Sequence, residues 1–222
     1  MVNPEAKTPR ERYRAQVRTE IKAHAWEQIA TAGASALSLN AIAKRLGMSG
    51  PALYRYYAGR DELITELIRD AYRSLADTFR ATAARPGADV SALAGALRTW
   101  ALEDPQRYFL LFGTPVPGYH APDDITAIAS EVMAAILDAI AGQPSGGPAR
   151  PFAAHLEEHR DWAGDHPAPA ATLHRALTFW TRLHGTLSLE LAGHFTGMGF
   201  DPALFYAAEL EELTGGAGHE GM

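Results

Sequence analysis

Residues 37–63 read LSLNAIAKRLGMSGPALYRYYAGRDEL, and they contain two short helix patterns separated by a tight turn. Ser38 can accept a hydrogen bond from an amide in the first turn of one helix, and Gly47 can end that helix in the left-handed conformation. Ser49 can cap a second helix, in whose first turn Pro51 is tolerated because the amides there have no intrahelical partner. Two helices joined in this way form a helix-turn-helix, whose second helix enters the major groove of DNA.

The second of these helices has an inward and an outward face. Leu53 and Tyr57 lie four residues apart and are expected to face the protein interior. Ala52, Arg55 and Tyr56 lie on the outward side. There the guanidinium fork of Arg55 can pair with guanine, and tyrosine hydroxyls can contact phosphate oxygens. The segment therefore predicts a DNA-reading surface.

Helix patterns also account for the chain on both sides of this segment. Thr8, Pro9 and Glu11 have the layout of a capping box with proline at the first helical position. The chain shows no alternating β pattern of useful length and no internal repeat, so we predict an all-α fold. It would consist of a three-helix head, residues 1–60, and a helical bundle, residues 61–222. The expected helices cover residues 9–32, 39–46, 50–57, 60–84, 89–103, 105–113, 123–141, 152–163, 170–196 and 202–214.

Charge is divided unevenly along the chain. Residues 1–60 hold ten Lys and Arg against four Glu, a net charge of +6, so that the total of −6 leaves −12 for the remaining 162 residues. A basic module that meets a polyanion, joined to an acidic body that does not, explains this division. The alternative is a chance run of charge on a solvated face.

Composition excludes several classes of protein. The chain has 222 residues with 47% hydrophobic residues, which is typical of a globular protein. Without cysteine it can form no disulfide scaffold, thiol nucleophile or thiolate zinc site. The N-terminus lacks the apolar stretch of a signal peptide, and residues 127–141 are too short and too charged to span a bilayer. We therefore expect a cytoplasmic protein that does not enter a membrane.

The segment from Leu37 to Ser49, with Leu53–Tyr57 and Arg60–Leu63, closely resembles the DNA-binding segment of the TetR (tetracycline-repressor-like) family. The resemblance covers roughly residues 15–70. It implies a homodimeric transcriptional regulator on a near-palindromic double-stranded DNA operator. The dipeptide Gly50-Pro51 replaces the commoner polar pair of the family, so we expect DNA shape to contribute to recognition beside Arg55. The DNA-binding residues that the resemblance implies are Ser38, Ser49, Gly50, Pro51, Ala52, Tyr54, Arg55, Tyr56 and Arg60.

These residues have different implied roles. Ser38 and Ser49 match positions that cap helices and contact phosphate. Tyr54, Tyr56 and Arg60 match phosphate contacts. The other four residues occupy positions that face bases, namely Gly50, Pro51, Ala52 and Arg55.

The acidic body resembles a branch of the same family named for a Trp/His/Gly signature, on residues 106–119 and 179–185. This resemblance implies a small-molecule effector and a dimer interface formed by the last two long helices. The candidate pocket residues are Trp100, Tyr108, Phe112, Tyr119, Met133, Trp180 and His184. The candidate interface residues are Leu177, Leu187, Leu191 and Phe195. Ordinary core packing is the alternative for the aromatic residues, and a wholly buried central helix is the alternative for residues 170–196.

His155 and His159 lie one helical turn apart, as two metal ligands on one helix face would. Leu156 stands where the metalloprotease motif has glutamate, and a solvated helix face explains the pair as well. No phosphate-cradling glycine loop and no nucleophile elbow is present, so we expect no metal, no cofactor and no enzyme.

The leading hypothesis is a dimeric repressor that a small molecule releases from DNA. Two rivals are a non-specific architectural DNA-binding protein and an enzyme that uses the histidine-rich stretch.

Overall fold

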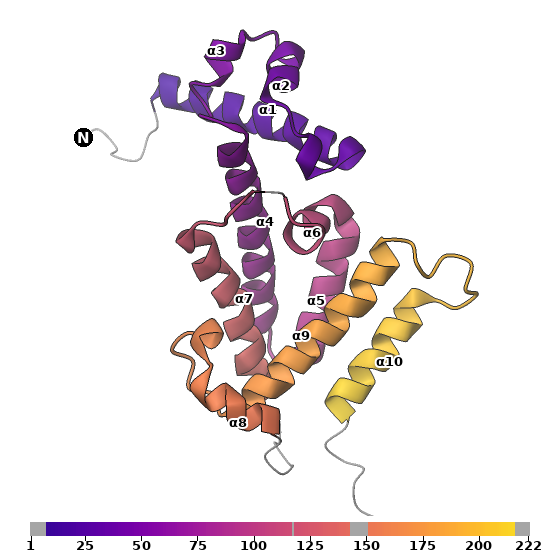
Figure 1. Cartoon of the computed structure of the whole chain (residues 1–222). Coiled ribbons are helices and arrows are strands. Elements are labelled where there is room, and N and C mark those ends of the chain that lie inside the picture. Colours follow the sequence, from indigo (N-terminus) through magenta and orange to yellow (C-terminus); the bar gives the residue numbers. More distant parts are fainter. Residues whose placement is uncertain (1–7, 117, 143–150, 216–222) are drawn as a thin grey trace, which may run out of the picture. The chain divides into compact units, whose positions relative to one another are not determined.

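The computed structural model describes residues 8–116, 118–142 and 151–215, and the regular elements within these ranges are all helical (Figure 1). The chain divides into two compact units. The first unit contains the described residues up to Asp70 together with Phe109–Pro122, and the second contains Ala71–Tyr108 and the described residues from Asp123 onward. The predicted all-α fold is confirmed. No helix in the described ranges is both long and apolar enough to span a membrane.

The first unit begins with a helix whose ends are set by local chemistry. The hydroxyl of Thr8 accepts a hydrogen bond from the amide of Glu11, and the Glu11 carboxylate accepts one from the amide of Thr8. This is the predicted capping box, and Pro9 is the first helical residue. The helices of this unit are α1 (Pro9–Ala32), the 3₁₀ turn η1 (Ala34–Ala36), α2 (Leu39–Arg45), α3 (Gly50–Leu53), the first part of α4 (Arg60–Ala83) and the end of α6 (Pro105–Phe112).

The turn between α2 and α3 depends on Gly47, whose φ is +65°. A side chain at this φ would be strained. The amide of Met48 reaches back to the carbonyl of Ala43 at 2.9 Å and closes the end of α2. The predicted helix over residues 50–57 is wrong in length, because α3 ends at Leu53. The amide of Tyr56 bonds the carbonyl of Leu53 three residues before it, so the chain turns tightly instead of continuing the helix.

The second unit is built around α9, which packs against α5, α7, α8 and α10. Its buried residues include Leu173, Ala176, Phe179 and Leu183. The elements not yet given are α5 (Val90–Glu103), α7 (Asp123–Ala141), α8 (Pro151–Glu158), the 3₁₀ turn η2 (Asp161–Ala163), α9 (Ala170–Leu191) and α10 (Pro202–Gly215).

Two helices of this unit are shorter than predicted. The expected helix over residues 170–196 ends at Leu191, where Gly193 takes a φ of +78° and the amide of His194 bonds the carbonyl of Leu189 at 2.9 Å. This is a glycine-dependent helix end, and it leaves Phe195 outside the helix. The expected helix over residues 152–163 ends at Glu158 and is followed by η2.

Candidate nucleic-acid interface

The start of α2 is fixed to α1 by one side chain. The amide group of Gln28 on α1 accepts a hydrogen bond from the amide of Ser38 at 2.8 Å and donates one to the Ser38 carbonyl at 3.4 Å. The hydroxyls of Ser38 and Ser49 each accept a backbone hydrogen bond, from Ala41 at 3.3 Å and Ala52 at 3.4 Å. Their predicted capping roles are confirmed, and their phosphate contacts remain predictions.

The helix α3 and the turn after it have the predicted inward and outward faces. Leu53 and Tyr57 are fully buried in the first unit. The side chain of Tyr54 is 47% exposed. The other predicted DNA-binding residues of this segment are each exposed or half-buried. They are Ser49, Gly50, Pro51, Ala52, Arg55 and Tyr56. The segment therefore presents the residues that the sequence assigned to DNA.

Arg60, at the start of α4, has a structural partner that the sequence did not indicate. Its guanidinium donates to the carbonyl of Ala34 at 3.2 Å and lies 3.9 Å from the carboxylate of Asp61. The side chain is about one third exposed. Arg60 thus ties the turn after α1 to α4, and a phosphate contact by its remaining donors stays a prediction.

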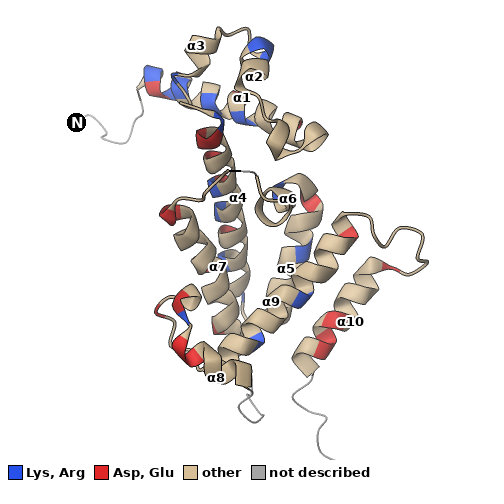
Figure 2. Ribbon diagram, in the orientation of Figure 1, with Lys and Arg blue, Asp and Glu red and all other residues tan. Residues whose placement is uncertain are grey.

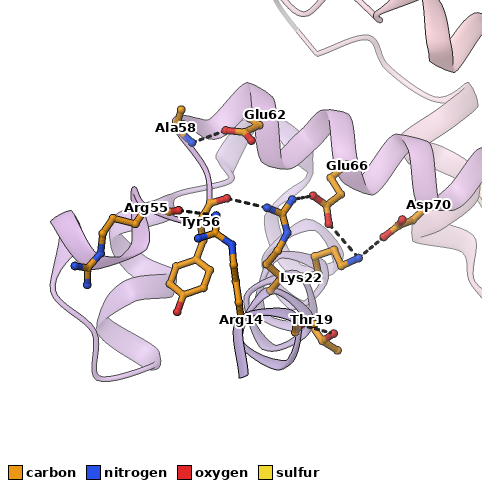
Figure 3. Close-up of polar contacts among 11 residues, drawn as sticks. Arg14, Thr19, Lys22, Arg55, Tyr56, Ala58, Glu62, Glu66 and Asp70 are labelled. Carbon is orange, nitrogen blue, oxygen red and sulfur yellow. Dashed lines mark hydrogen bonds and ion pairs between the residues drawn. The ribbon is translucent and has the colours of Figure 1, made fainter. Parts of the chain in front are cut away.

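Three further basic residues of α1 are engaged within the first unit, and sequence reasoning counted them only as charge (Figure 3). Arg14 donates to the carbonyl of Arg55 at 3.1 Å. Arg18 donates to the carbonyl of Tyr56 at 3.1 Å and pairs with Glu66 of α4. Lys22 lies 3.3 Å from Glu66 and 2.6 Å from Asp70. No local sequence signal connects these pairs, because their partners lie 38 to 48 residues away.

The remaining positive charges of the head differ in whether they have an internal partner. Arg45 pairs with Glu27 at 2.7 Å. Within residues 8–60, the described part of the head, the side chains of four other cations have no hydrogen-bond or ion-pair partner. They are Arg10 and Arg12 on α1, Lys44 on α2, and Arg55 after α3. Figure 2 shows Lys and Arg along α1 and α2. Lys7 lies outside the described residues.

In the second unit, three of the predicted pocket residues, Tyr108, Trp180 and His184, meet in a polar and aromatic cluster. The hydroxyl of Tyr108 lies 2.9 Å from Nδ1 of His184 and 2.7 Å from the hydroxyl of Ser188. The Trp180 ring meets the His184 ring edge-on with centroids 4.0 Å apart. Trp100, a fourth predicted pocket residue, is buried, and its indole donates to Ser74 at 3.1 Å. Burial lowers the pKa of His184 to about 4, so the ring is neutral near pH 7.

The other predicted pocket residues lie elsewhere. Phe112 and Tyr119 belong to the first unit, and Met133 is half-buried on α7 of the second. The second unit contains a cavity of about 520 Å³ that none of the seven predicted residues lines. The cavity lies among residues of α4, α7 and the start of α5, namely Ala76, Arg80, Ala83, Ala88, Asp89, Leu93, Glu131, Ala134, Ala135, Asp138 and Ala139.

The predicted interface residues differ in exposure. Leu187 is fully buried within its own unit, so its side chain belongs to the core and offers no surface to a partner. Leu177, Leu191 and Phe195 are half-buried. The exposed side of α9 and its C-terminal cap carry a different set of residues at three- and four-residue intervals, all of them small except Leu189, namely Thr178, Thr181, Gly185, Leu189 and Ala192. That spacing of small residues was the signal in the sequence that could have identified this face.

The histidine pair at the C-terminal end of α8 lies on the surface. His155 and His159 are exposed, and their rings stack with centroids 3.9 Å apart. Nδ1 of His159 lies 3.0 Å from the carbonyl of His155. Among the described residues, no group of three or more His, Asp or Glu side chains could hold a metal ion.

Both parts of the chain match known families. Residues 21–67 match the bacterial regulatory proteins of the tetR family. Residues 90–213 match the tetracyclin repressor-like C-terminal domain, which is compatible with the branch expected from the Trp/His/Gly signature.

Whole-chain relatives agree with these matches. The HTH-type transcriptional regulators Rv1816 of Mycobacterium tuberculosis and Mb1846 of Mycobacterium bovis are each 39% identical to this chain over 215 residues, which span 90% of this chain and 92% of each relative. A crystal structure of the regulatory protein SCO4313 is 74% identical, with a TM-score of 0.86, and covers 94% of this chain and all of that one.

Proposed function

Because the chain belongs to the TetR family of helix-turn-helix transcriptional regulators, we propose that it is a homodimeric repressor that a small-molecule effector releases from its operator. The observation that carries the DNA-binding part is the outward surface of α2 and α3. It exposes Arg55 and keeps Lys44 free of acidic partners within the described chain. A cation without an internal partner can neutralise phosphate without first breaking an ion pair.

The recognition surface divides between reading and positioning. Arg55 is the side chain suited to guanine, because its fork matches the two acceptors on the major-groove edge. Arg10, Arg12 and Lys44 supply phosphate contacts, which set the register of the protein on the duplex. Two heads related by a two-fold axis would contact half-sites about 34–36 Å apart, so the operator is expected to be near-palindromic.

The proposed dimer face combines α9 with α10. The exposed small residues of α9 would let a partner helix approach closely, and a Cβ added to Gly185 meets no atom within 4 Å. Leu204 and Phe205 of α10 are 71% and 37% exposed, although both are large and apolar. An apolar helix side that its own chain leaves uncovered is typical of an interface.

The proposed effector binds in the second unit. Its cavity of about 520 Å³ is of the size that small molecules occupy in proteins. An effector releases DNA only if it binds the DNA-free conformation more tightly than the DNA-bound one. Compounds that raise the melting temperature of the protein should therefore be tested for release from the operator. A compound that binds this unit and leaves operator affinity unchanged would not be the effector.

The experiment that tests the function is selection of duplexes from a random DNA pool by the purified protein. We expect enrichment of one near-palindromic sequence that survives competition by unrelated duplex. If three cations in each of two heads contact phosphate, the slope of log K against log salt is roughly −5. A protein that enriches no sequence and binds all duplexes with the same salt dependence would instead be an architectural DNA binder.

A further inference from the structure

The recognition helix is too short to fix its own orientation. The helix α3 has four residues, about one turn, and an isolated turn of this length is unstable in water. The carbonyls of Arg55 and Tyr56 follow directly after it. Among the described backbone hydrogen bonds, none ends on either carbonyl. These two carbonyls, in the turn that follows α3, therefore depend on partners from another element.

Two arginines of α1 provide those partners. Arg14 donates to the carbonyl of Arg55 and Arg18 to the carbonyl of Tyr56, each at 3.1 Å (Figure 3). The guanidinium of Arg18 also lies over the buried ring of Tyr57, 4.4 Å from its centroid. Hydrogen bonds from a charged donor are stronger than those between neutral groups, and the ring contact adds a cation–π attraction.

Arg18 also reaches the long helix α4. Its second terminal nitrogen pairs with Glu66, whose side chain is 17% exposed. Lys22 contacts the other oxygen of the same carboxylate at 3.3 Å. Partial burial of Glu66 reduces screening of these pairs by water and salt. The planar guanidinium of Arg18 thus bridges α4 and the recognition segment, residues 50–57, through two different terminal nitrogens. A lysine has a single donor nitrogen and would not reproduce this fixed fork.

We propose that Arg18 is a positioning residue for operator recognition. It orients the segment that carries Pro51, Tyr54 and Arg55, because its guanidinium binds the Tyr56 carbonyl and the Glu66 carboxylate at the same time. It does so without contacting DNA. This inference rests on the proposed DNA-binding function. It assigns a role in sequence recognition to a residue of α1 outside the helix-turn-helix motif itself.

The test compares Arg18→Gln with the matched control Lys22→Gln. Both changes remove one positive charge from α1 and one partner from Glu66, but the described hydrogen bonds and ion pairs of Lys22 are with Glu66 and Asp70 and not with the recognition segment. Affinity is measured for the duplex selected by the wild-type protein and for a scrambled duplex of equal length. We expect Arg18→Gln to lose about tenfold in affinity for the selected duplex and little for the scrambled one. We expect Lys22→Gln to keep the wild-type ratio of the two affinities.

Two further variants separate positioning from direct contact. Loss of a carboxylate from a DNA-binding head strengthens DNA binding if only net charge matters. Positioning predicts the opposite sign, so Glu66→Gln should weaken binding to the selected duplex. Arg18→Lys should also lower the affinity ratio, because a lysine keeps the charge but lacks the two fixed nitrogens that bind the Tyr56 carbonyl and Glu66, whereas a simple phosphate contact would tolerate it. The salt slope of each Arg18 variant should equal that of the wild type.

Three results would overturn the inference. A salt slope smaller in magnitude by about 0.9 for Arg18→Gln, with equal loss on both duplexes, would make Arg18 a phosphate contact. An equal drop in the affinity ratio for Arg18→Gln and Lys22→Gln, with equal drops in melting temperature, would reduce the effect to general stability. An unchanged ratio for all Arg18 and Glu66 variants would remove the positioning role. A wild-type protein that prefers no selected duplex would overturn the proposed function itself.

Discussion

Arg55 is the residue on which base reading most depends. Its neighbours Gly50, Pro51 and Ala52 carry no hydrogen-bonding side chain, so they can contribute shape and apolar contact only. The Arg55 side chain is exposed, and its own carbonyl is held by Arg14. The residue therefore combines a free guanidinium with a fixed backbone.

We predict that Arg55→Ala loses about 1–3 kcal/mol of binding free energy on the selected operator and relaxes the choice of base at one position in each half-site. Binding of wild-type and variant protein to a set of single-base operator variants measures both effects. Lys44→Ala is the control, since loss of a phosphate contact weakens binding to all sequences alike. If Arg55→Ala weakens binding to all sequences by the same factor, Arg55 is a phosphate contact like Lys44 and does not read a base.

At the scale of elements, the contact between α6 and α9 in the second unit depends on one neutral histidine. Tyr108 of α6 places its hydroxyl between Nδ1 of His184 and the hydroxyl of Ser188, both on α9. Burial raises the pKa of the Tyr108 hydroxyl and lowers that of His184 to about 4. Both groups are therefore neutral near pH 7 and exchange hydrogen bonds without a buried charge.

This pKa shift predicts a pH dependence of folding. Above the ordinary histidine pKa of 6.5 the ring is neutral in the folded and unfolded states, and its contribution is constant. As the pH falls from 6.5 towards 4, the unfolded chain takes up a proton that the folded protein does not, so stability decreases. We expect a contribution from His184 that is about 2 kcal/mol less favourable at pH 5 than at pH 7.

Urea unfolding at these two pH values measures the change in the free energy of unfolding. His184→Gln should lose this part of the pH dependence, because glutamine takes up no proton. The same substitution at the exposed His159 should retain the wild-type difference between the two pH values. Equal pH dependence in wild type and His184→Gln would contradict the buried neutral histidine.

At the scale of the whole molecule, the proposed function depends on a second copy of the chain. The exposed side of α9 centres on Gly185, where an added side chain would point into open space in a single chain. We predict that Gly185→Arg leaves the melting behaviour of the isolated chain intact and converts the dimer to a monomer, because a long charged side chain would lie in the proposed interface. Sedimentation equilibrium measures the mass, and operator affinity should fall with the loss of the dimer.

The matched control is Gly95→Arg on α5. Gly95 is also exposed in a helix, and its added Cβ meets no atom within 4 Å. We expect this variant to remain a dimer with wild-type affinity for the operator. If Gly185→Arg forms dimers with the dissociation constant of the wild type, the interface lies on another surface.

Local patterns in the sequence are enough to predict features that depend on neighbouring residues. The full extent of α1, the capping hydroxyls of Ser38 and Ser49, the stop at Gly47 and the inward pair Leu53 and Tyr57 all follow from caps, glycine conformation and apolar spacing within a few residues. The all-α class and the basic head follow from the same local patterns and from charge. These features could be predicted because their physical causes lie within one or two helical turns.

The tertiary structure alone decided which charges are free and which side chains are covered. Arg14, Arg18 and Arg60 look in sequence like any other head cation, yet each donates to a carbonyl 26 to 41 residues away. The spacing of Leu187 along the helix fits an apolar stripe at a dimer interface, but its side chain is buried by its own chain. Whether a side chain finds an internal partner depends on elements that meet only after folding, and no local pattern encodes that meeting.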